Sequence, residues 1–378
     1  MAKSKAKAGG SADTRRKPPA QLPPIPAPVA KIAELDHALV RLVQERAKLV
    51  LETAKHGASP AQASLASALD EESLKRLTAT SGGPLPHGCL RAVLREIQSG
   101  CRSLIRESRI AFLGPLYSFS HLAAIHHFGQ SVEFIPVGTI AAVFEEVRRK
   151  QSDFGLVPVE NSTDGRVTDT LEMFTRMRVR ICGEVELRIH HTLLGKCPRT
   201  EVREVYSKPQ ALSQCRNWLA KHLPAARTIE VTSTSTAAQL AGEKPGAAAI
   251  ASLQAGVHYG LEVLAENIED NPSNTTRFAV IGDEAPPRTG NDRTAMLFQV
   301  EHRPGALADA MVVFKRGKLN LTWIESFPIP GTNRGYLFFV EMEGHHSDAP
   351  LRRAVATLEK TTLRLEILGS FPATTPVE

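Results

Sequence analysis

The 378-residue sequence has no run that approaches the ~20 consecutive apolar residues of a membrane-spanning helix. The basic residues near its N-terminus are not followed by the apolar segment of a secretory signal. Its five cysteines are odd in number and form no CxxC pair, which argues against a disulfide framework and against a zinc site. These absences predict a cytoplasmic protein with reduced thiols and no membrane partner.

Motifs for nucleotides and metals are missing too. The sequence has neither a GxGxxG fingerprint nor a P-loop. Its histidine pairs at 126–127, 190–191 and 345–346 are sequence neighbours. Neighbours point to opposite faces of a strand, and on a helix they lack the i, i+4 spacing that metal ligands use. We therefore expect no metal ion and no cofactor.

The net charge of +6 is concentrated in one short segment. Residues 1–28 carry six basic residues, one acidic residue and six prolines, whereas the remaining 350 residues carry 40 basic and 39 acidic ones. A segment of this composition cannot form a core, so we predict a disordered, solvated tail. A folded nucleic-acid-binding domain would carry its basic surplus on one face, so no nucleic-acid partner is expected.

Residues 29–107 have the pattern of a helical module. Apolar residues from Ile32 to Val50 recur at spacings of three, four and seven and form one stripe. An alanine-rich segment up to Leu77 predicts a second helix, a Gly- and Pro-rich loop follows at 81–86, and a third helix is expected over 89–106. The long first stripe indicates that it needs a partner chain.

The region 108–284 alternates short apolar strands with helical segments, which is typical of α/β proteins. We predict strands at 110–113, 134–137, 154–158, 180–182, 186–194, 247–251 and 278–281, and helices at 118–128, around 144–147 and at 209–223. The segment 186–194 crosses between two halves. The region should therefore form two lobes with a cleft, and ligands in such folds bind at the carboxyl ends of strands.

A linker is expected at 284–291, before a smaller C-terminal region. Residues 292–374 follow the order strand, helix, strand, strand, helix, strand. This βαββαβ order predicts an α+β, ferredoxin-like sandwich, so the chain should contain several domains.

Small polar residues follow several of the predicted strands. They are Ser118, the segment 160–165, Ser207, Gln214 and the segment 274–278. Any one of them alone is better explained as a helix cap or a turn residue, because Ser, Thr and Asn serve routinely as both. Together, at equivalent places in one α/β unit, they also describe a polar pocket.

Several sequence blocks resemble, in order, those of prephenate dehydratase. They are 110–124 (IAFLGPLYSFSHLAA), 155–165 (GLVPVENSTDG), 190–194 (HHTLL), 206–215 (YSKPQALSQC), 259–261 (YGL) and 274–278 (NTTRF). Residues 303–307 (RPGAL) and 325–328 (ESFP) resemble the phenylalanine-binding ACT domain. The helical module resembles the chorismate mutase module of bifunctional P-proteins. The resemblance covers nearly the whole chain after residue 28 and implies a periplasmic-binding-protein-like fold for the two-lobed domain.

The resemblance implies a lyase of phenylalanine biosynthesis that converts prephenate into phenylpyruvate, carbon dioxide and water. Because hydroxide is a poor leaving group, the site needs a hydrogen-bond donor at the departing hydroxyl. The family assigns this role to the threonine of Thr-Arg-Phe, here Thr276, and the other expected catalytic residues are Glu160 and Asn161. The expected substrate-binding residues are Ser118, Thr163, Ser207, Gln214 and Arg277. For Glu160 and Arg277, salt bridges between elements are an alternative interpretation.

In the ACT-like region, the resemblance implies a phenylalanine site at a subunit interface. Its expected residues are Gly305, Ala306, Leu307, Asn320, Glu325 and Ser326. Backbone N–H groups at the start of the helix near residue 306 can hold a carboxylate. We therefore expect a homodimer or homotetramer that is inhibited by L-phenylalanine, and the alternative is a domain that only assembles the oligomer.

Three positions depart from the family pattern. Tyr117 stands where glycine is usual, Lys208 replaces the histidine of Ser-His-Pro-Gln, and Phe327 replaces the arginine of Glu-Ser-Arg-Pro. Lysine cannot accept a hydrogen bond as a neutral imidazole can. The expected donors are retained, so dehydratase activity is still expected, whereas the change at residue 327 bears on the strength of phenylalanine inhibition.

The mutase-like module keeps Arg46 of the family's catalytic residues. Val29, Gly57, Gln62-Ala63 and Ile105 stand where other cationic or polar groups are usual. Since each such group contributes ~3–4 kcal/mol to a transition state, we expect a module that has lost its activity and serves dimerisation. A shifted second helix would restore part of the site.

Three alternatives to this account follow from the same residues. One is a fully bifunctional chorismate mutase/prephenate dehydratase. Another is arogenate dehydratase, whose substrate differs only by an amino group on its side chain. A third is a two-lobed amino-acid sensor without catalysis, because folds of this kind serve both purposes.

Overall fold

The computed structural model describes residues 27–55, 77, 82–283, 285–329 and 335–377. The predicted disordered tail lies outside the described residues, except for residues 27 and 28, and so does the predicted second helix up to residue 76. The chain divides into two compact units, Met1–Leu49 and Val50–Glu378. Among the described residues, no helix is long and apolar enough to cross a membrane.

Helix α1 (Ala27–Lys55) confirms the first predicted helix of the helical module. Its predicted stripe stays open to solvent, since five of its leucine and isoleucine residues are each 56–63% exposed. They are Ile32, Leu35, Leu39, Leu42 and Leu49.

Helix α4 (His87–Ser103) is the predicted third helix and belongs to the second unit. It is anchored at the end of helix α5 (Phe119–Phe128), where the Arg102 guanidinium donates to the carbonyl of Phe128 over 3.1 Å. Next to it, the N–H of Gln130 donates to the carboxylate of Glu96 over 2.9 Å.

The first lobe is built on a mixed sheet in the order β2-β1-β3-β11-β5, with β4 paired to β3. Its strands are β1 (Arg109–Leu113), β2 (Glu133–Val137), β3 (Phe154–Asn161), β4 (Gly165–Arg166), β5 (Arg180–Arg188) and β11 (Thr275–Gly282). Helix α5 packs on one face, whereas α6 (Ile140–Arg148) and α7 (Thr168–Arg176) pack on the other. Strand β11 runs antiparallel to both of its neighbours, so it returns the chain from the second lobe to the first.

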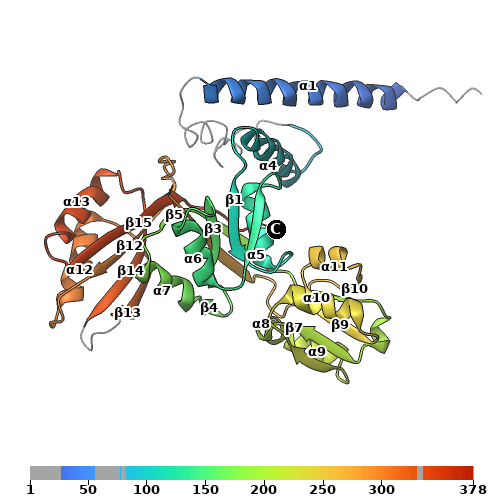
Figure 1. The fold of residues 1–378 in the computed structure, drawn as a ribbon. Helices are drawn as coiled ribbons and strands as arrows, with labels where there is room; N and C mark the ends of the chain where they lie inside the picture. The colour runs from blue at the N-terminus through green and yellow to red at the C-terminus, as the bar shows by residue number, and fades with distance from the viewer. Residues whose placement is uncertain (1–26, 56–76, 78–81, 284, 330–334, 378) are drawn as a thin grey trace, which may run out of the picture. The chain divides into compact units, whose positions relative to one another are not determined.

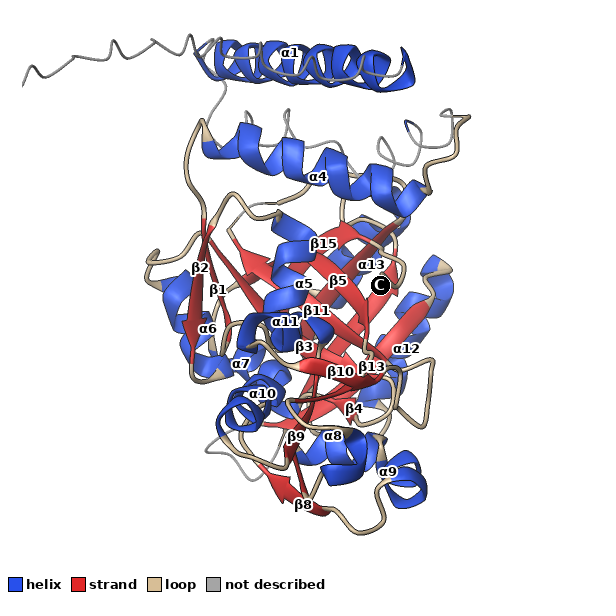
Figure 2. Ribbon diagram, turned by 90° about the vertical axis from the view of Figure 1, so that its right-hand side faces the viewer, coloured by secondary structure: helices blue, strands red, loops and turns tan. Residues whose placement is uncertain are grey.

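The second lobe has a five-stranded sheet in the order β10-β6-β9-β7-β8. Its strands are β6 (Thr192–Gly195), β7 (Glu204–Ser207), β8 (Arg227–Glu230), β9 (Ala247–Ala251) and β10 (Glu262–Ala265). Helices α10 (Thr234–Glu243) and α11 (Leu253–Tyr259) cover one face, whereas α8 (Pro209–Gln214) and α9 (Arg216–His222) cover the other (Figure 1, Figure 2). The predicted helix 209–223 is therefore two short helices that meet at Cys215.

The prediction of one strand over 186–194 is wrong, because the chain leaves one sheet and enters the other within it. Strand β5 ends at Arg188 and β6 begins at Thr192. Between them, the N–H of Ile189 donates to the carbonyl of Asn274, and the carbonyl of His191 accepts from the N–H of Ile268, both over 2.9 Å. The two segments that cross between the lobes are thus hydrogen-bonded to each other.

The C-terminal region has the predicted βαββαβ order. Its elements are β12 (Asp292–Gln299), α12 (Ala306–Gly317), β13 (Leu321–Pro328), β14 (Tyr336–Glu343), α13 (Ala349–Leu358) and β15 (Arg364–Pro372). The strands form an antiparallel sheet in the order β13-β14-β12-β15. Both helices pack on one face of this sheet, around Phe298 and Phe314.

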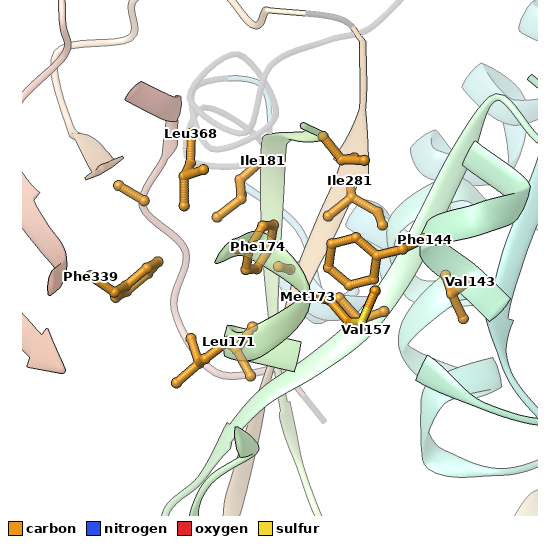
Figure 3. Close-up of a cluster of buried hydrophobic side chains, with 14 of the residues drawn as sticks. Val143, Phe144, Val157, Leu171, Met173, Phe174, Ile181, Ile281, Phe339 and Leu368 are labelled. Carbon is orange, nitrogen blue, oxygen red and sulfur yellow. The ribbon is translucent and has the colours of Figure 1, made fainter. Parts of the chain in front are cut away.

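The other face of the C-terminal sheet packs directly on the first lobe (Figure 3). Phe339 and Leu368 from the C-terminal sheet share one buried cluster with Phe174 and Ile181 of the lobe. Phe327, which occupies the position of the family's arginine, also belongs to this cluster and is 7% exposed. The two regions therefore share one hydrophobic core.

Candidate active site

A hydrogen-bonded cluster of side chains lies where the two crossing segments meet the carboxyl end of β3. The amide Nδ2 of Asn161 donates to the Oγ1 of Thr276 over 2.8 Å and to the Oδ1 of Asn274 over 3.0 Å. Thr163 donates from its hydroxyl to the same Oδ1 over 3.2 Å, and the Nδ2 of Asn274 donates to the Oε1 of Gln214 over 3.0 Å. We call Asn161, Thr163, Gln214, Asn274 and Thr276 the amide cluster.

The turn after β3 explains why Asn161 is held so firmly. Its Oδ1 accepts from the backbone N–H groups of Thr163 and Asp164, each over 2.9 Å. Asn and Asp commonly close turns in this way. With Oδ1 bonded to two N–H groups, the Nδ2 of Asn161 must face Thr276 and Asn274.

Gln214 links the cluster to the second lobe. Its Oε1 lies 2.8 Å from the Nε2 of His191, and its Nε2 donates to the carboxylate of Asp164 over 2.8 Å. Because the Oε1 can only accept, His191 carries its proton on Nε2. Burial lowers the pKa of His191, although the hydrogen bond to Gln214 and the nearby Glu269 oppose that effect. Burial thus favours the neutral imidazole of His191 next to Gln214.

A separate cavity of about 520 Å³ opens at the first turn of α5. Its walls come from both lobes, with Gly138 and Ser118 on one side and Lys208 and Thr234 on the other. The N-termini of α5 and α10 lie in this wall, since their N-caps, Ser118 and Ser233, both line the cavity. Helix N-termini and a lysine together favour an anionic ligand.

The loop before α5 joins the lobes through Tyr117. Its φ of 63° lies in the left-handed region, which usually requires glycine. The tyrosine ring stacks on His258 of α11 with centroids 4.0 Å apart, and its carbonyl accepts from the hydroxyl of Ser252 over 3.1 Å. These contacts with the second lobe hold the loop in a conformation that tyrosine rarely adopts.

His121 fixes the same loop from within the first lobe. Its Nδ1 accepts from the N–H of Tyr117 over 3.0 Å, and its ring stacks on Phe112 with centroids 5.0 Å apart. Burial lowers the pKa of His121 to about 4. The neutral imidazole, which alone can accept at Nδ1, is therefore the form at neutral pH.

Three of the residues expected at the site lie elsewhere. The hydroxyl of Ser207 is fully buried and donates to the carbonyl of Ile250 over 2.6 Å, so it joins β7 to β9. Arg277 is 9% exposed and points away from the amide cluster toward Glu341, 2.6 Å away. Glu160 faces Arg277, with 3.6 Å between the Nε of Arg277 and its carboxylate. Alternation along β3 and β11 puts Glu160 and Arg277 on the face opposite Asn161 and Thr276. The structure therefore does not support substrate binding by Arg277 or catalysis by Glu160. Both residues form salt bridges between elements, which was the alternative interpretation.

The residues expected to bind phenylalanine lie in three parts of the C-terminal region. Gly305, Ala306 and Leu307 start α12, where Gly305 has a left-handed φ of 83°. Asn320 follows the other end of α12, about 18 Å away along a 12-residue helix, and its Nδ2 donates to the carboxylate of Glu343 over 2.9 Å. Glu325 and Ser326 lie on β13, the edge strand of the sheet. A single chain therefore does not bring Gly305 and Asn320 together.

Asn274 belongs to the amide cluster and His191 contacts it, but the sequence analysis selected neither residue. Asn274 is 1% exposed and contacts three other members of the amide cluster. Its only signal in the sequence was its place in the block 274–278, and an asparagine before a strand is typical of a turn. The described residues contain no group of three His, Cys, Asp or Glu side chains that could hold a metal ion.

Two lobes, a polar cluster at their crossing and an anion-favouring cavity define a class of α/β proteins that take a small, charged ligand between lobes. Residues 110–286 match the family model of prephenate dehydratase. A bifunctional chorismate mutase/prephenate dehydratase of Aquifex aeolicus is 41% identical over 350 residues, which are 90% of this chain and 96% of the relative. The chain belongs to the prephenate dehydratase family, in its bifunctional chorismate mutase/prephenate dehydratase type.

A solved structure of a prephenate dehydratase agrees with this membership. A prephenate dehydratase of Arthrobacter aurescens in complex with L-Phe has a TM-score of 0.65 and 32% identity, covering 70% of this chain and 90% of its own. A structure described as a novel type of quorum quenching acylase has the same TM-score of 0.65 and 30% identity, covering 70% of this chain and 98% of its own.

Proposed function

We propose that the chain converts prephenate into phenylpyruvate, carbon dioxide and water, with Thr276 as the donor to the departing hydroxyl. In this reaction the bond to the ring carboxylate breaks, its electron pair completes the aromatic ring, and hydroxide leaves from the opposite carbon of the ring. Negative charge therefore grows on the hydroxyl oxygen. A donor placed there stabilises the transition state more than the ground state.

One observation supports this role most directly. The Oγ1 of Thr276 accepts a hydrogen bond from Asn161. A hydroxyl that accepts from one neighbour keeps its own proton for another acceptor, and Thr276 donates to no residue that the structure describes. Its half-buried hydroxyl is thus a donor that Asn161 has already oriented.

The side chains of the amide cluster carry no charge, which is favourable where the ring carboxylate has to leave. A cation bonded to that carboxylate would stabilise the substrate more than the transition state. The side-chain carboxylate stays in the product, so it can be bound tightly. We assign it to the helix N-termini and Lys208 of the cavity near Ser118, which keep a substrate-binding role for Ser118.

The test is conversion of prephenate and of arogenate by the purified full chain. Formation of phenylpyruvate from prephenate supports the proposal. Conversion of arogenate but not of prephenate would show that the protein is an arogenate dehydratase. Binding of an aromatic amino acid without conversion of either substrate would support the alternative of a sensor without catalysis.

Acyl hydrolysis, the activity named for one similar structure, needs a nucleophile activated by a base. The Ser118 hydroxyl donates to the carbonyl of Leu113 over 3.2 Å, and the nearby Nδ1 of His121 accepts from Tyr117 instead. In the described part of the chain, no hydroxyl that lines this cavity is hydrogen-bonded to an imidazole. The geometry therefore favours the dehydratase.

We also propose that the C-terminal region is an ACT domain that binds L-phenylalanine between two subunits. The supporting observation is the separation of its expected residues at the two ends of α12. A second copy would bring Gly305 of one chain near Asn320 of the other. The test is calorimetric titration with L-phenylalanine, together with the oligomeric state by light scattering. A monomer that binds phenylalanine would contradict the interface.

For the N-terminal module, we propose dimerisation without mutase activity in a cytoplasmic enzyme. Arg46 lies on α1 together with the exposed stripe, and other cationic or polar groups of the family are replaced by Val29, Gly57, Gln62-Ala63 and Ile105. Purified protein should not rearrange chorismate at a useful rate. Product from chorismate would show that the module is active and the enzyme bifunctional.

A further inference from the structure

Strand β11, which carries Thr276, contacts the C-terminal domain. The contact is on the face of the sheet opposite to the Thr276 side chain. Residue 277 follows Thr276 on β11, and its side chain points to the opposite face of the sheet. The burial pattern agrees, because Phe278 and Val280 belong to the core beneath α5, whereas Ala279 and Ile281 belong to the core shared with the C-terminal domain. Arg277 therefore faces the C-terminal domain.

Arg277 is held there by groups from both domains. Its Nη1 donates to Glu341 of β14 over 2.6 Å and lies 3.5 Å from Glu184 of β5. Its guanidinium carbon lies 4.8 Å from the centre of the Trp323 ring on β13. Glu341 and Glu184 are 3% and 4% exposed. Burial alone would lower the pKa of Arg277, but the carboxylates, Glu341 first, raise it above its ordinary value. Arg277 thus stays charged.

Arg293 completes this buried group. Its Nη1 lies 3.4 Å from Glu184 and 3.5 Å from Glu341, so each carboxylate faces two guanidinium groups. Removing one member of such a group leaves an unpaired buried charge, which is strongly unfavourable. The position of Arg277 relative to Glu341 is therefore set within narrow limits.

A second contact of the same kind lies on the strand that pairs with Asn161. Arg166 of β4 donates to Glu325 of β13 over 2.7 Å. In the β3–β4 pair, Arg166 is the register partner of Glu160, and Gly165 is the register partner of Asn161. Thr276 is therefore next to Arg277, which Glu341 holds, and Asn161 pairs with Gly165, the neighbour of Arg166, which Glu325 holds.

We propose that Arg277 is a positioning residue, and that its pair with Glu341, aided by Arg166–Glu325, makes the Asn161–Thr276 hydrogen bond depend on the placement of the C-terminal domain. A shift of that domain must either move Arg277, and with it Thr276, or leave a buried charge unpaired. Because Glu325 is also an expected phenylalanine-binding residue, a ligand there would compete with Arg166. The inference rests on the proposed dehydratase function.

The experiment compares the full-length protein with its Glu341→Gln variant in steady-state kinetics on prephenate. The glutamine has nearly the same shape but no charge, so Arg277 loses its closest partner. We expect kcat to fall about tenfold, because small misplacements of catalytic groups carry penalties of this size or larger. The KM should change less than about twofold, since Arg277 does not contact substrate. Glu366→Gln is the matched control, because Glu366 pairs with Arg364 on the same β15 strand and not with Arg277.

Arg166→Gln provides a second, independent variant that should fold, because the Arg166 side chain is 57% exposed. We expect a fall in kcat in the same direction, about two- to threefold, because only the secondary contact is lost. The inference is wrong if both variants fold and keep the kcat of the parent protein. It is also wrong if both variants raise KM without lowering kcat. If Glu341→Gln does not fold, Arg166→Gln decides. A parent protein without activity on prephenate would instead contradict the proposed function.

Discussion

The amide Nδ2 of Asn161 lies 2.8 Å from the Oγ1 of Thr276, and the two residues are register partners on β3 and β11. These strands are 115 positions apart at this point of the sequence. The pairing brings a fixed amide donor to a hydroxyl whose own proton is then directed elsewhere. This relationship carries the proposed chemistry.

Replacing Asn161 by aspartate should reverse the direction of this hydrogen bond. In Asn161→Asp a carboxylate oxygen replaces the amide nitrogen, so the Thr276 hydroxyl would donate to it and not to the substrate. We expect kcat for prephenate to fall about 100-fold, within the range for loss of one positioned donor. Asn271→Asp, an exposed turn residue that accepts from Ser273, is the matched control. Equal kcat values for the two variants would contradict this role.

Asn274 should matter for stability as well as for rate. It is 1% exposed, and its truncation in Asn274→Ala would remove one partner each from Asn161, Thr163 and Gln214. Unpaired buried polar groups cost about 1–3 kcal/mol. Urea unfolding followed by circular dichroism should show a loss in that range. A loss below about 0.5 kcal/mol would mean that the cluster is solvated and not preorganised.

Acid should destabilise the protein through His121. Its pKa is about 4 in the folded protein because of burial, against about 6.5 in an unfolded chain. The unfolded state therefore binds more protons as the pH falls below about 6.5, and stability is lost down to about pH 4. The loss from this residue is on the order of 2–3 kcal/mol. In His121→Asn, which retains an acceptor but does not titrate, the pH dependence of urea unfolding should be shallower. An unchanged dependence would exclude His121 as a cause.

Tyr117 should affect substrate affinity through contact between the lobes. Tyr117→Gly would relieve the left-handed φ of 63°, yet it removes the ring that stacks on His258. We expect KM for prephenate to rise several-fold, because the loop before Ser118 loses its contact with the second lobe. Tyr117→Phe keeps the ring and should retain the parent KM, since the tyrosine hydroxyl makes no hydrogen bond to a described residue. Equal KM values in both variants would count against this role of the stacking.

Several elements of the fold were predictable from local pattern. The strand at 247–251 was predicted with the bounds of β9, because it is a short, wholly buried apolar run. The order of the C-terminal elements also followed from alternating strands and helices. In contrast, α7, α10, α11, β7, β8 and β10 were not predicted. Strand β8 is a largely exposed edge, and α10 is built from small residues, so neither has the strong apolar periodicity that marks an element.

The site was predictable only where it follows strand ends. Asn161, Thr163, Gln214 and Thr276 do come together, because β3, β11 and the end of α8 converge at the crossing between lobes. The interpretation of Arg277 needed the structure, since its partners Glu184 and Glu341 are 93 and 64 positions away. The sequence pattern predicts on which face of a strand a side chain lies. The residues that contact this face depend on tertiary packing.

The most direct test of the account compares kcat for prephenate in the full-length protein and its Thr276→Val and Thr276→Ser variants. Valine has nearly the shape of threonine and lacks the hydroxyl, whereas serine keeps it. We predict that Thr276→Val loses 100- to 1,000-fold or about 3–4 kcal/mol of transition-state stabilisation, with little change in KM, and that Thr276→Ser stays within about tenfold of the parent. If Thr276→Val keeps the parent kcat, another group donates to the departing hydroxyl and the account is contradicted.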